Sequence, residues 1–188
     1  LIEITSEILA EKDEHGDFLV NKILDTAMQK GTGKWTVVSA LEEGQPLTLI
    51  TEAVYARVLS SMKSERMISS KLIEKPVFIP AEVEKTLEYL MNALYAAKII
   101  SYAQGFSLLK SASDRYTWEL NLEGIASIWR GGCIIRSAFL DDISKAYTKN
   151  SGLNNLMVDD YFHDELVRAV KGLREIIILG VRNGIALP

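Results

Sequence analysis

Cysteine and histidine are scarce in this 188-residue chain, which contains one cysteine and two histidines. The single cysteine, Cys133, excludes an internal disulfide framework and a cysteine-based zinc cluster. The histidines, His15 and His163, lie far apart in the sequence and have no neighbours at metal-ligand spacing. We therefore expect no metal site, and a reducing, cytoplasmic setting is the default for such a chain.

Long apolar runs and an excess of positive charge are also missing. No apolar run is long enough to span a bilayer and no secretory signal pattern is present, so we expect no membrane partner. The formal net charge is −4 and the sequence pI is about 5.3, which argues against a nucleic-acid partner. Any phosphate chemistry must therefore depend on a few local cations.

The main pattern that the sequence does contain is the spacing of apolar residues at the period of an α-helix. It predicts long helices over residues 81–109, 122–147 and 159–182, whereas no alternating pattern persists long enough to build a sheet. Apolar residues surround nearly the whole circumference of a further helix over residues 47–67, which predicts that this helix is buried. We therefore expect one all-α domain over residues 1–188, a bundle with long buried helices. No G-x-G-x-x-G string follows a strand, so we expect no dinucleotide-binding unit here.

Both ends of the sequence look like interior parts of a longer protein. Leu1 already lies within an amphipathic helical pattern, and the residues before Pro188 have no feature of a natural terminus. The mean hydropathy is +0.09, which indicates extensive burial and favours a subunit interface. We therefore expect a fragment of a longer chain that self-associates.

The most specific local feature is the string KGTGKW at residues 30–35, which stands just before a helical pattern. Gly31 and Gly33 allow the backbone to approach an anion closely, and the first turn of a helix presents unpaired backbone N–H groups. Lys30 adds a positive charge and Thr32 adds a hydroxyl donor. The loop is therefore suited to holding a phosphate. The alternative is a solvated turn between helices, in which glycine and lysine are common.

Arg57 lies in the middle of the apolar helix predicted over residues 47–67, and no acidic residue stands three or four positions from it. A buried guanidinium requires an anion, because an unpaired buried charge is strongly destabilising. The partner is either a carboxylate distant in the sequence or a ligand phosphate, unless the side chain extends to solvent. Arg57 is thus a second candidate for phosphate binding.

Two adjacent glycines, Gly131 and Gly132, interrupt the helical pattern over residues 122–147. Each destabilises a helix interior by about 1 kcal/mol relative to alanine, and a close helix–helix crossing is the simplest compensation. The next residue, Cys133, is followed by two isoleucines and has no histidine nearby in the sequence. We therefore do not expect it to act as a nucleophile.

Four separated blocks of the sequence together resemble the C-terminal helical domain of the 6-phosphogluconate dehydrogenase family. The blocks are ILD and KGTGKWT within residues 23–36, EAVYAR and two serines within 52–61, the segment 99–106, and RGGCIIR at 130–136. They follow one another in the family's order and span essentially the whole chain.

The resemblance implies a homodimeric enzyme of the pentose phosphate pathway, which oxidises and decarboxylates 6-phosphogluconate to ribulose 5-phosphate and reduces NADP. The family positions that help to bind the substrate phosphate match Lys30, Thr32 and Arg57. Met28 departs from the family pattern, which has glycine or alanine there, and its larger side chain could shift the loop or fill a neighbouring pocket.

By the same resemblance, the catalytic lysine and glutamate and the NADP-binding Rossmann domain precede Leu1, and a tail that completes the partner subunit's site follows Pro188. We therefore expect no catalytic and no cofactor-binding residue among these 188, and no activity from them alone. Two alternatives stay open: a non-catalytic helical dimerisation module with a vestigial anion site, and another β-hydroxyacid dehydrogenase relative. The complete KGTGKW string disfavours the second.

Overall fold

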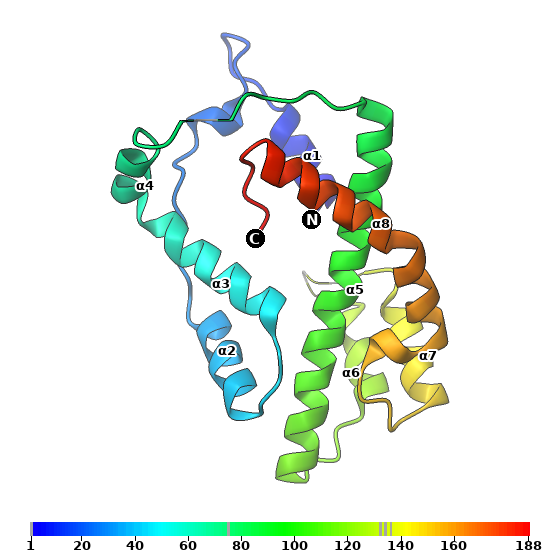
Figure 1. The fold of residues 1–188 in the computed structure, drawn as a ribbon. Helices are drawn as coiled ribbons and strands as arrows, with labels where there is room; N and C mark the ends of the chain where they lie inside the picture. Colours follow the sequence, from blue (N-terminus) through cyan, green and yellow to red (C-terminus); the bar gives the residue numbers. More distant parts are fainter. Residues whose placement is uncertain (1, 75, 132, 134, 136) are drawn as a thin grey trace.

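The computed structural model describes residues 2–74, 76–131, 133, 135 and 137–188, and its regular structure is helical (Figure 1). Within these residues no strand forms, and the expectation of an all-α fold is confirmed. The elements are α1 (Ile2–Ala10), the 3-10 helix η1 (Leu19–Lys22), α2 (Thr32–Glu42), α3 (Thr48–Ser61), α4 (Lys63–Ser69), α5 (Val83–Tyr116), α6 (Leu122–Trp129), α7 (Leu140–Lys149), the 3-10 helix η2 (Leu156–Val158) and α8 (Asp160–Arg182).

The 34-residue helix α5 is the axis of the molecule, with α2, α3 and α4 on one side of it and α6 and α7 on the other (Figure 1). Helix α8 begins at the N-cap Asp159, whose side chain accepts a hydrogen bond from Tyr161 N at 3.1 Å. It then packs along α5 so closely that a Cβ on Gly172 would lie 2.8 Å from the carbonyl oxygen of Tyr89. Only a residue without a side chain lets the two backbones approach in this way.

The core lies between α5, α6, α7 and α8 and is rich in aromatic side chains. Phe106 and Phe162 are fully buried, and the ring of Phe106 contacts those of Trp129 and Tyr147, with centroid distances of 5.4 Å in both cases. Burial of such large rings supplies much of the hydrophobic stabilisation of a domain of this size. This main cluster of buried residues lies within residues 99–162.

The prediction of a continuous helix over residues 122–147 is wrong, because α6 ends at Trp129 and α7 begins at Leu140. The break allows Trp129 and Phe139 to reach the same ring on α5, that of Tyr102, at centroid distances of 6.4 and 5.0 Å. Gly131 lies in this break and not at a helix crossing, whereas Gly132 lies outside the described residues. The close crossing occurs instead at Gly172.

The prediction of one buried helix over residues 47–67 is also wrong, in two respects. The chain bends at Met62, which separates α3 from α4, and no residue of α3 is buried within the described part of the chain. Tyr55 and Leu59 are 61% and 57% exposed. Other apolar residues of α3, such as Val54, are partly buried, so the helix is apolar on several sides but only partly covered by the other described segments.

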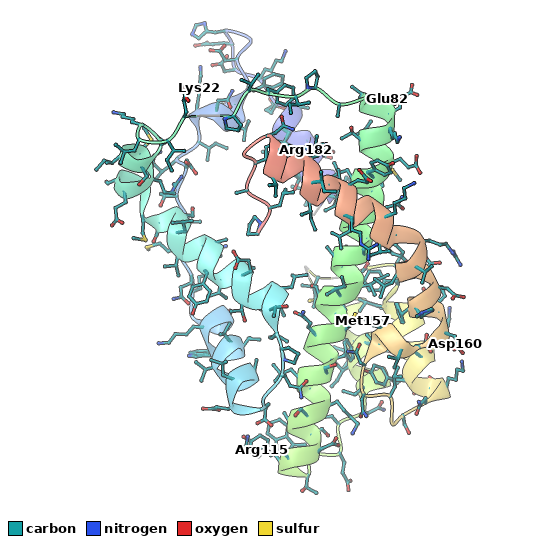
Figure 2. The ribbon with its side chains drawn as sticks, viewed as in Figure 1. Lys22, Glu82, Arg115, Met157, Asp160 and Arg182 are labelled. Carbon is teal, nitrogen blue, oxygen red and sulfur yellow. The ribbon has the colours of Figure 1, made fainter. Side chains whose placement is uncertain are left out.

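Two side chains from α5 attach the α2–α3 layer to the core. Gln104 accepts a hydrogen bond from Leu49 N at 3.0 Å and donates to Thr48 Oγ1 at 2.9 Å, which satisfies polar groups at the N-terminus of α3. At the C-terminal end of α5, Arg115 donates to Glu42 O at 2.7 Å (Figure 2). Gln104 thus fixes the N-terminus of α3, whereas Arg115 fixes only the C-terminal end of α2. None of the described helices is both long and apolar enough to cross a membrane.

Candidate functional site

The loop before α2 has the backbone geometry that an anion site requires. Gly31 occupies the N-cap position with φ of 101°, a conformation that side-chain-bearing residues rarely adopt. The first N–H with a helical acceptor is that of Trp35, which donates to Gly31 O at 3.0 Å. Among the described residues no side chain caps this terminus, so the N–H groups of residues 32–34 can receive a ligand.

Arg57 extends from α3 toward this loop. Its guanidinium donates to the backbone carbonyl of Met28, two residues before Lys30. Within the described chain no carboxylate lies within 4.0 Å of the Arg57 guanidinium. Arg57 therefore does not form the ion pair with a distant acidic residue that the sequence left open. The premise that Arg57 is buried is wrong, because α3 lies at the surface and the side chain is exposed. The guanidinium therefore keeps N–H donors beyond the one that Met28 receives.

The three residues predicted to bind phosphate line one cavity between the loop and α3. Its volume is about 520 Å³. Lys30 and Thr32 contribute from the loop and the first turn of α2, and Arg57 contributes from α3. The remaining lining residues are Gln29, Gly33, Ile50, Ala53 and Val54. The cavity thus has two cationic side chains and a hydroxyl at a helix N-terminus, over an apolar floor supplied by α3.

Met28 affects this cavity through its backbone. Its side chain is 73% exposed and does not belong to the cavity lining within the described residues. The Met28 carbonyl is the group that orients Arg57. The expectation that the larger side chain fills a neighbouring pocket therefore finds no support in this geometry.

Sequence reasoning missed the residues that fix the path of the loop. Arg66, on α4, donates to Asp25 Oδ2 at 2.9 Å and to Asp25 O at 2.7 Å. This hydrogen bond from the guanidinium holds the pKa of the Asp25 carboxyl below its ordinary value. Ser60 accepts a hydrogen bond from Ala27 N at 3.1 Å. Asp25 and Ser60 belong to the quoted sequence blocks, but only the bend at Met62 brings Arg66 to them.

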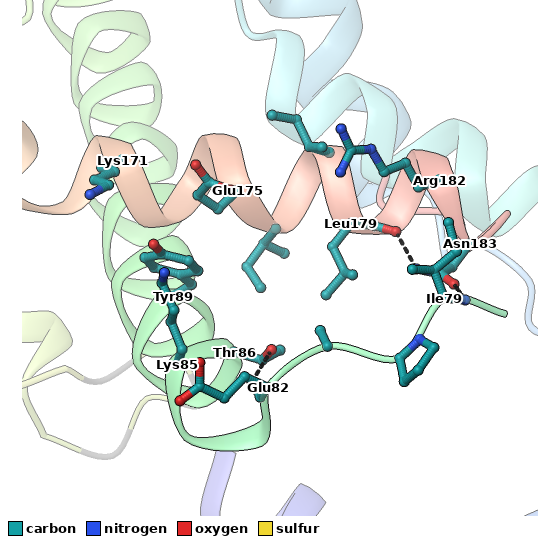
Figure 3. A pocket seen from close by; sticks show the side chains of 14 residues that line it. Ile79, Glu82, Lys85, Thr86, Tyr89, Lys171, Glu175, Leu179, Arg182 and Asn183 are labelled. Carbon is teal, nitrogen blue, oxygen red and sulfur yellow. Dashed lines mark hydrogen bonds between the residues drawn. The ribbon is translucent and has the colours of Figure 1, made fainter.

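A second cavity, of about 480 Å³, lies between α8, residues 79–82 and the N-terminal part of α5 (Figure 3). Lys171 and Arg182 line it from the same helix, eleven residues apart and thus separated by about 16 Å along the axis. Asn183 Oδ1 accepts from Ile79 N at 2.7 Å and closes one end. Its cations are spread along the rim, so it does not gather charge around one small anion as the first cavity does.

Metal binding has no candidate, because the described residues include no group of three or more His, Cys, Asp or Glu placed to hold an ion. Cys133 is half-buried and free. We therefore assign no catalytic or binding role to the described residues of the block at 130–136. Three residues of this block lie outside the residues that the structure describes.

Comparison with known proteins agrees over the full length of the chain. The family model of the 6-phosphogluconate dehydrogenase C-terminal domain matches residues 1–188. The decarboxylating 6-phosphogluconate dehydrogenase of Ovis aries is 53% identical over 190 residues, which cover 100% of this chain and 39% of the relative. That of Salmonella typhimurium is 48% identical over 189 residues, which cover 100% of this chain and 40% of the relative.

A solved structure shares the fold. The 6-phosphogluconate dehydrogenase of Plasmodium falciparum, described with its cofactor NADP+ and its substrate 6-phosphogluconate, has a TM-score of 0.93 and 42% identity. The match covers 100% of this chain and 41% of that chain. The chain therefore spans about two fifths of the length of these relatives. From its sequence blocks, its helical fold and these matches, the chain belongs to the 6-phosphogluconate dehydrogenase family and corresponds to its C-terminal domain.

Proposed function

We propose that the protein containing this chain oxidises 6-phosphogluconate with NADP and decarboxylates it to ribulose 5-phosphate, and that this chain binds the substrate phosphate. One observation supports the proposal that this chain binds the substrate phosphate. Lys30, Thr32 and Arg57 come from separate segments, yet they line one cavity at the N-terminus of α2. The proposed reaction is inferred from the name of the relatives, which are decarboxylating 6-phosphogluconate dehydrogenases.

The chemistry of the three side chains suits a phosphate monoester. Lys30 supplies a compact positive charge, Thr32 a hydroxyl donor, and Arg57 a planar fork that can grip two phosphate oxygens. The helix N-terminus adds backbone N–H donors and a favourable dipole. Holding the phosphate fixes one end of the sugar acid, so that its reacting carbons are presented to the rest of the enzyme in one orientation.

NADP would accept hydride from the C3 carbon of the substrate, after which the acid loses carbon dioxide. The described residues do not fit this cofactor, because a dinucleotide-binding unit requires parallel strands and these residues form none. We therefore assign the chain the binding and orientation of substrate, and neither the redox step nor the proton transfers.

We also propose that the protein is a cytoplasmic homodimer and that α3 takes part in the subunit contact. The support is the apolar surface of α3, where Tyr55 and Leu59 are more than half exposed. A protein that leaves such a surface uncovered tends to associate. Sedimentation velocity of the full-length protein at about 10 µM, a concentration suited to a modest interface, should show a dimer. A well-folded monomer at that concentration would refute the proposal.

Steady-state assays of the full-length protein test the proposed activity, with reduction of NADP followed by absorbance. Turnover of 6-phosphogluconate is expected, with strong discrimination against unphosphorylated gluconate because the cavity is then left with unpaired cations. The isolated 188-residue chain should show no turnover. If the full-length protein dimerises and binds inorganic phosphate without reducing NADP, the dimerisation module with a vestigial anion site is the correct reading.

A further inference from the structure

The segment between η1 and α2 contains the phosphate-binding lysine but has no regular secondary structure over residues 23–31. Repeating backbone hydrogen bonds therefore cannot fix its path, and individual contacts must do so. The structure provides these contacts at Asp25, Ala27 and Met28, all made with residues at the end of α3 or in α4.

Arg66 is the centre of this set. One amino group donates to Asp25 Oδ2 at 2.9 Å, and the other donates both to Asp25 O at 2.7 Å and to Ser60 O at 3.0 Å. The same guanidinium therefore joins the loop to the C-terminus of α3, where backbone carbonyls lack helical partners. The side chain is 29% exposed, which is low for an arginine on a helix at the surface.

We propose that Arg66 is a positioning residue for substrate binding, which acts with Asp25 and Ser60 to hold the loop so that Lys30 faces Arg57. This inference rests on the proposed function, because it concerns the same phosphate cavity. We call Arg66, Asp25 and Ser60 the loop clamp.

The distance along the chain supports this role. Ala27 is the clamped residue nearest to Lys30, and Lys30 follows it by three residues, at most about 11 Å of extended chain, so a displacement of the clamped segment is passed on to the Lys30 backbone. Arg57 donates to Met28, so the same displacement also moves the guanidinium. A shift of about 1 Å in a binding group is enough to weaken the binding of a phosphate that several donors must reach together.

Arginine is required at this position because its planar fork reaches a carboxylate and two carbonyls in one geometry. A lysine would keep the charge but present a single nitrogen. Arg66→Lys in the full-length enzyme therefore tests the clamp with little change in charge or size. We expect about a tenfold rise in KM for 6-phosphogluconate and a similar rise in the inhibition constant of inorganic phosphate. KM for NADP should stay within about twofold of the wild-type value.

Arg115→Lys is the matched control. Arg115 also joins a carboxylate and a carbonyl, those of Glu43 and Glu42, but at the C-terminal end of α2, away from the cavity. Its substitution should lower thermal stability to a similar extent and leave KM for 6-phosphogluconate and inhibition by phosphate unchanged. A merely structural role for Arg66 predicts that the two variants behave alike, and that result would overturn the proposal.

Ser60→Ala gives a second, milder test if Arg66→Lys does not fold. It removes the hydroxyl that accepts from Ala27 N, and we expect about a threefold rise in the inhibition constant of phosphate, in line with the loss of one hydrogen bond. An unchanged constant would count against the clamp. A wild-type enzyme without 6-phosphogluconate turnover refutes the proposed function, whereas an active wild type with unaltered Arg66→Lys and Ser60→Ala variants refutes only the clamp.

Discussion

A Cβ on Gly33 would lie 2.8 Å from Cγ2 of Val54, so the first turn of α2 touches α3 with no room for a methyl group. Val54 is β-branched and holds its rotamer stiffly in a helix, so it cannot easily move aside. Both residues line the cavity in which we propose that the phosphate binds. Their contact therefore sets the distance between the loop that carries Lys30 and the helix that carries Arg57.

Gly33→Ala in the full-length enzyme should separate α2 from α3 and raise KM for 6-phosphogluconate by about tenfold, as expected for a small misplacement of binding groups. Val54→Ala alone should change KM little. The double variant should recover most of the lost affinity, because the methyl group then has space. Failure of the double variant to recover would show that the backbone flexibility of Gly33, and not its contact with Val54, is what matters.

Arg57→Lys keeps the positive charge in the cavity but removes the planar fork. We expect the binding of 6-phosphogluconate to weaken by about 1.5–3 kcal/mol, the range for a hydrogen bond to a charged group. The affinity for NADP should not change. Isothermal titration with each ligand separately measures both, and equal losses for the two ligands would contradict a phosphate-specific role.

Tyr147 is a buried tyrosine, 3% exposed, whose hydroxyl has no hydrogen-bond partner among the described residues. Burial raises the pKa of this hydroxyl well above its ordinary value near 10. The folded state therefore favours the neutral form, and the contribution of Tyr147 to stability is complete below about pH 10 and declines as the pH rises above it.

Tyr147→Phe should raise the free energy of unfolding near pH 7 by about 1 kcal/mol, because it removes an unsatisfied buried polar group. It should also make the loss of stability above about pH 10 less steep. Tyr95→Phe is the control, since the Tyr95 hydroxyl lies 3.4 Å from that of Tyr161 and loses a partner on substitution. Urea unfolding at several pH values checks both, and a less stable Tyr147→Phe variant would disprove the prediction.

Gly172 and Gly105 are both helical glycines, but only Gly172 lies against another backbone. A Cβ on Gly172 would lie 2.6 Å from Asn92 Cβ, whereas one on Gly105 would meet nothing within 4 Å. Gly172→Ala should therefore destabilise the protein by about 3 kcal/mol through overpacking. Gly105→Ala should stabilise it by about 0.5–1 kcal/mol through helix propensity. Thermal unfolding measures both changes, and similar effects at the two positions would contradict the crossing geometry.

The sequence predicted several elements of the fold from local patterns alone. Apolar spacing placed α8 almost at its observed bounds, because the helix has both an amphipathic pattern and the capping Asp159. The same spacing failed over residues 122–147 and 47–67. There the helices end at Trp129 and Ser61. The first of these ends stands just before Gly131 and Gly132, a pair that disfavours helix and that the spacing of apolar residues does not take into account.

For the site, the sequence by itself determined which groups could bind a phosphate. Gly31, Gly33, Lys30 and Thr32 carry that chemistry in one short string. Arg57 was a second candidate because its apolar helix offers no acidic partner three or four positions away, and the family resemblance agrees with it. Whether a distant carboxylate would neutralise Arg57 was decided only by the tertiary structure, which turns the guanidinium toward Met28 O. The loop clamp likewise depends on the bend at Met62, because contacts between residues 41 positions apart are set by packing and not by neighbouring residues.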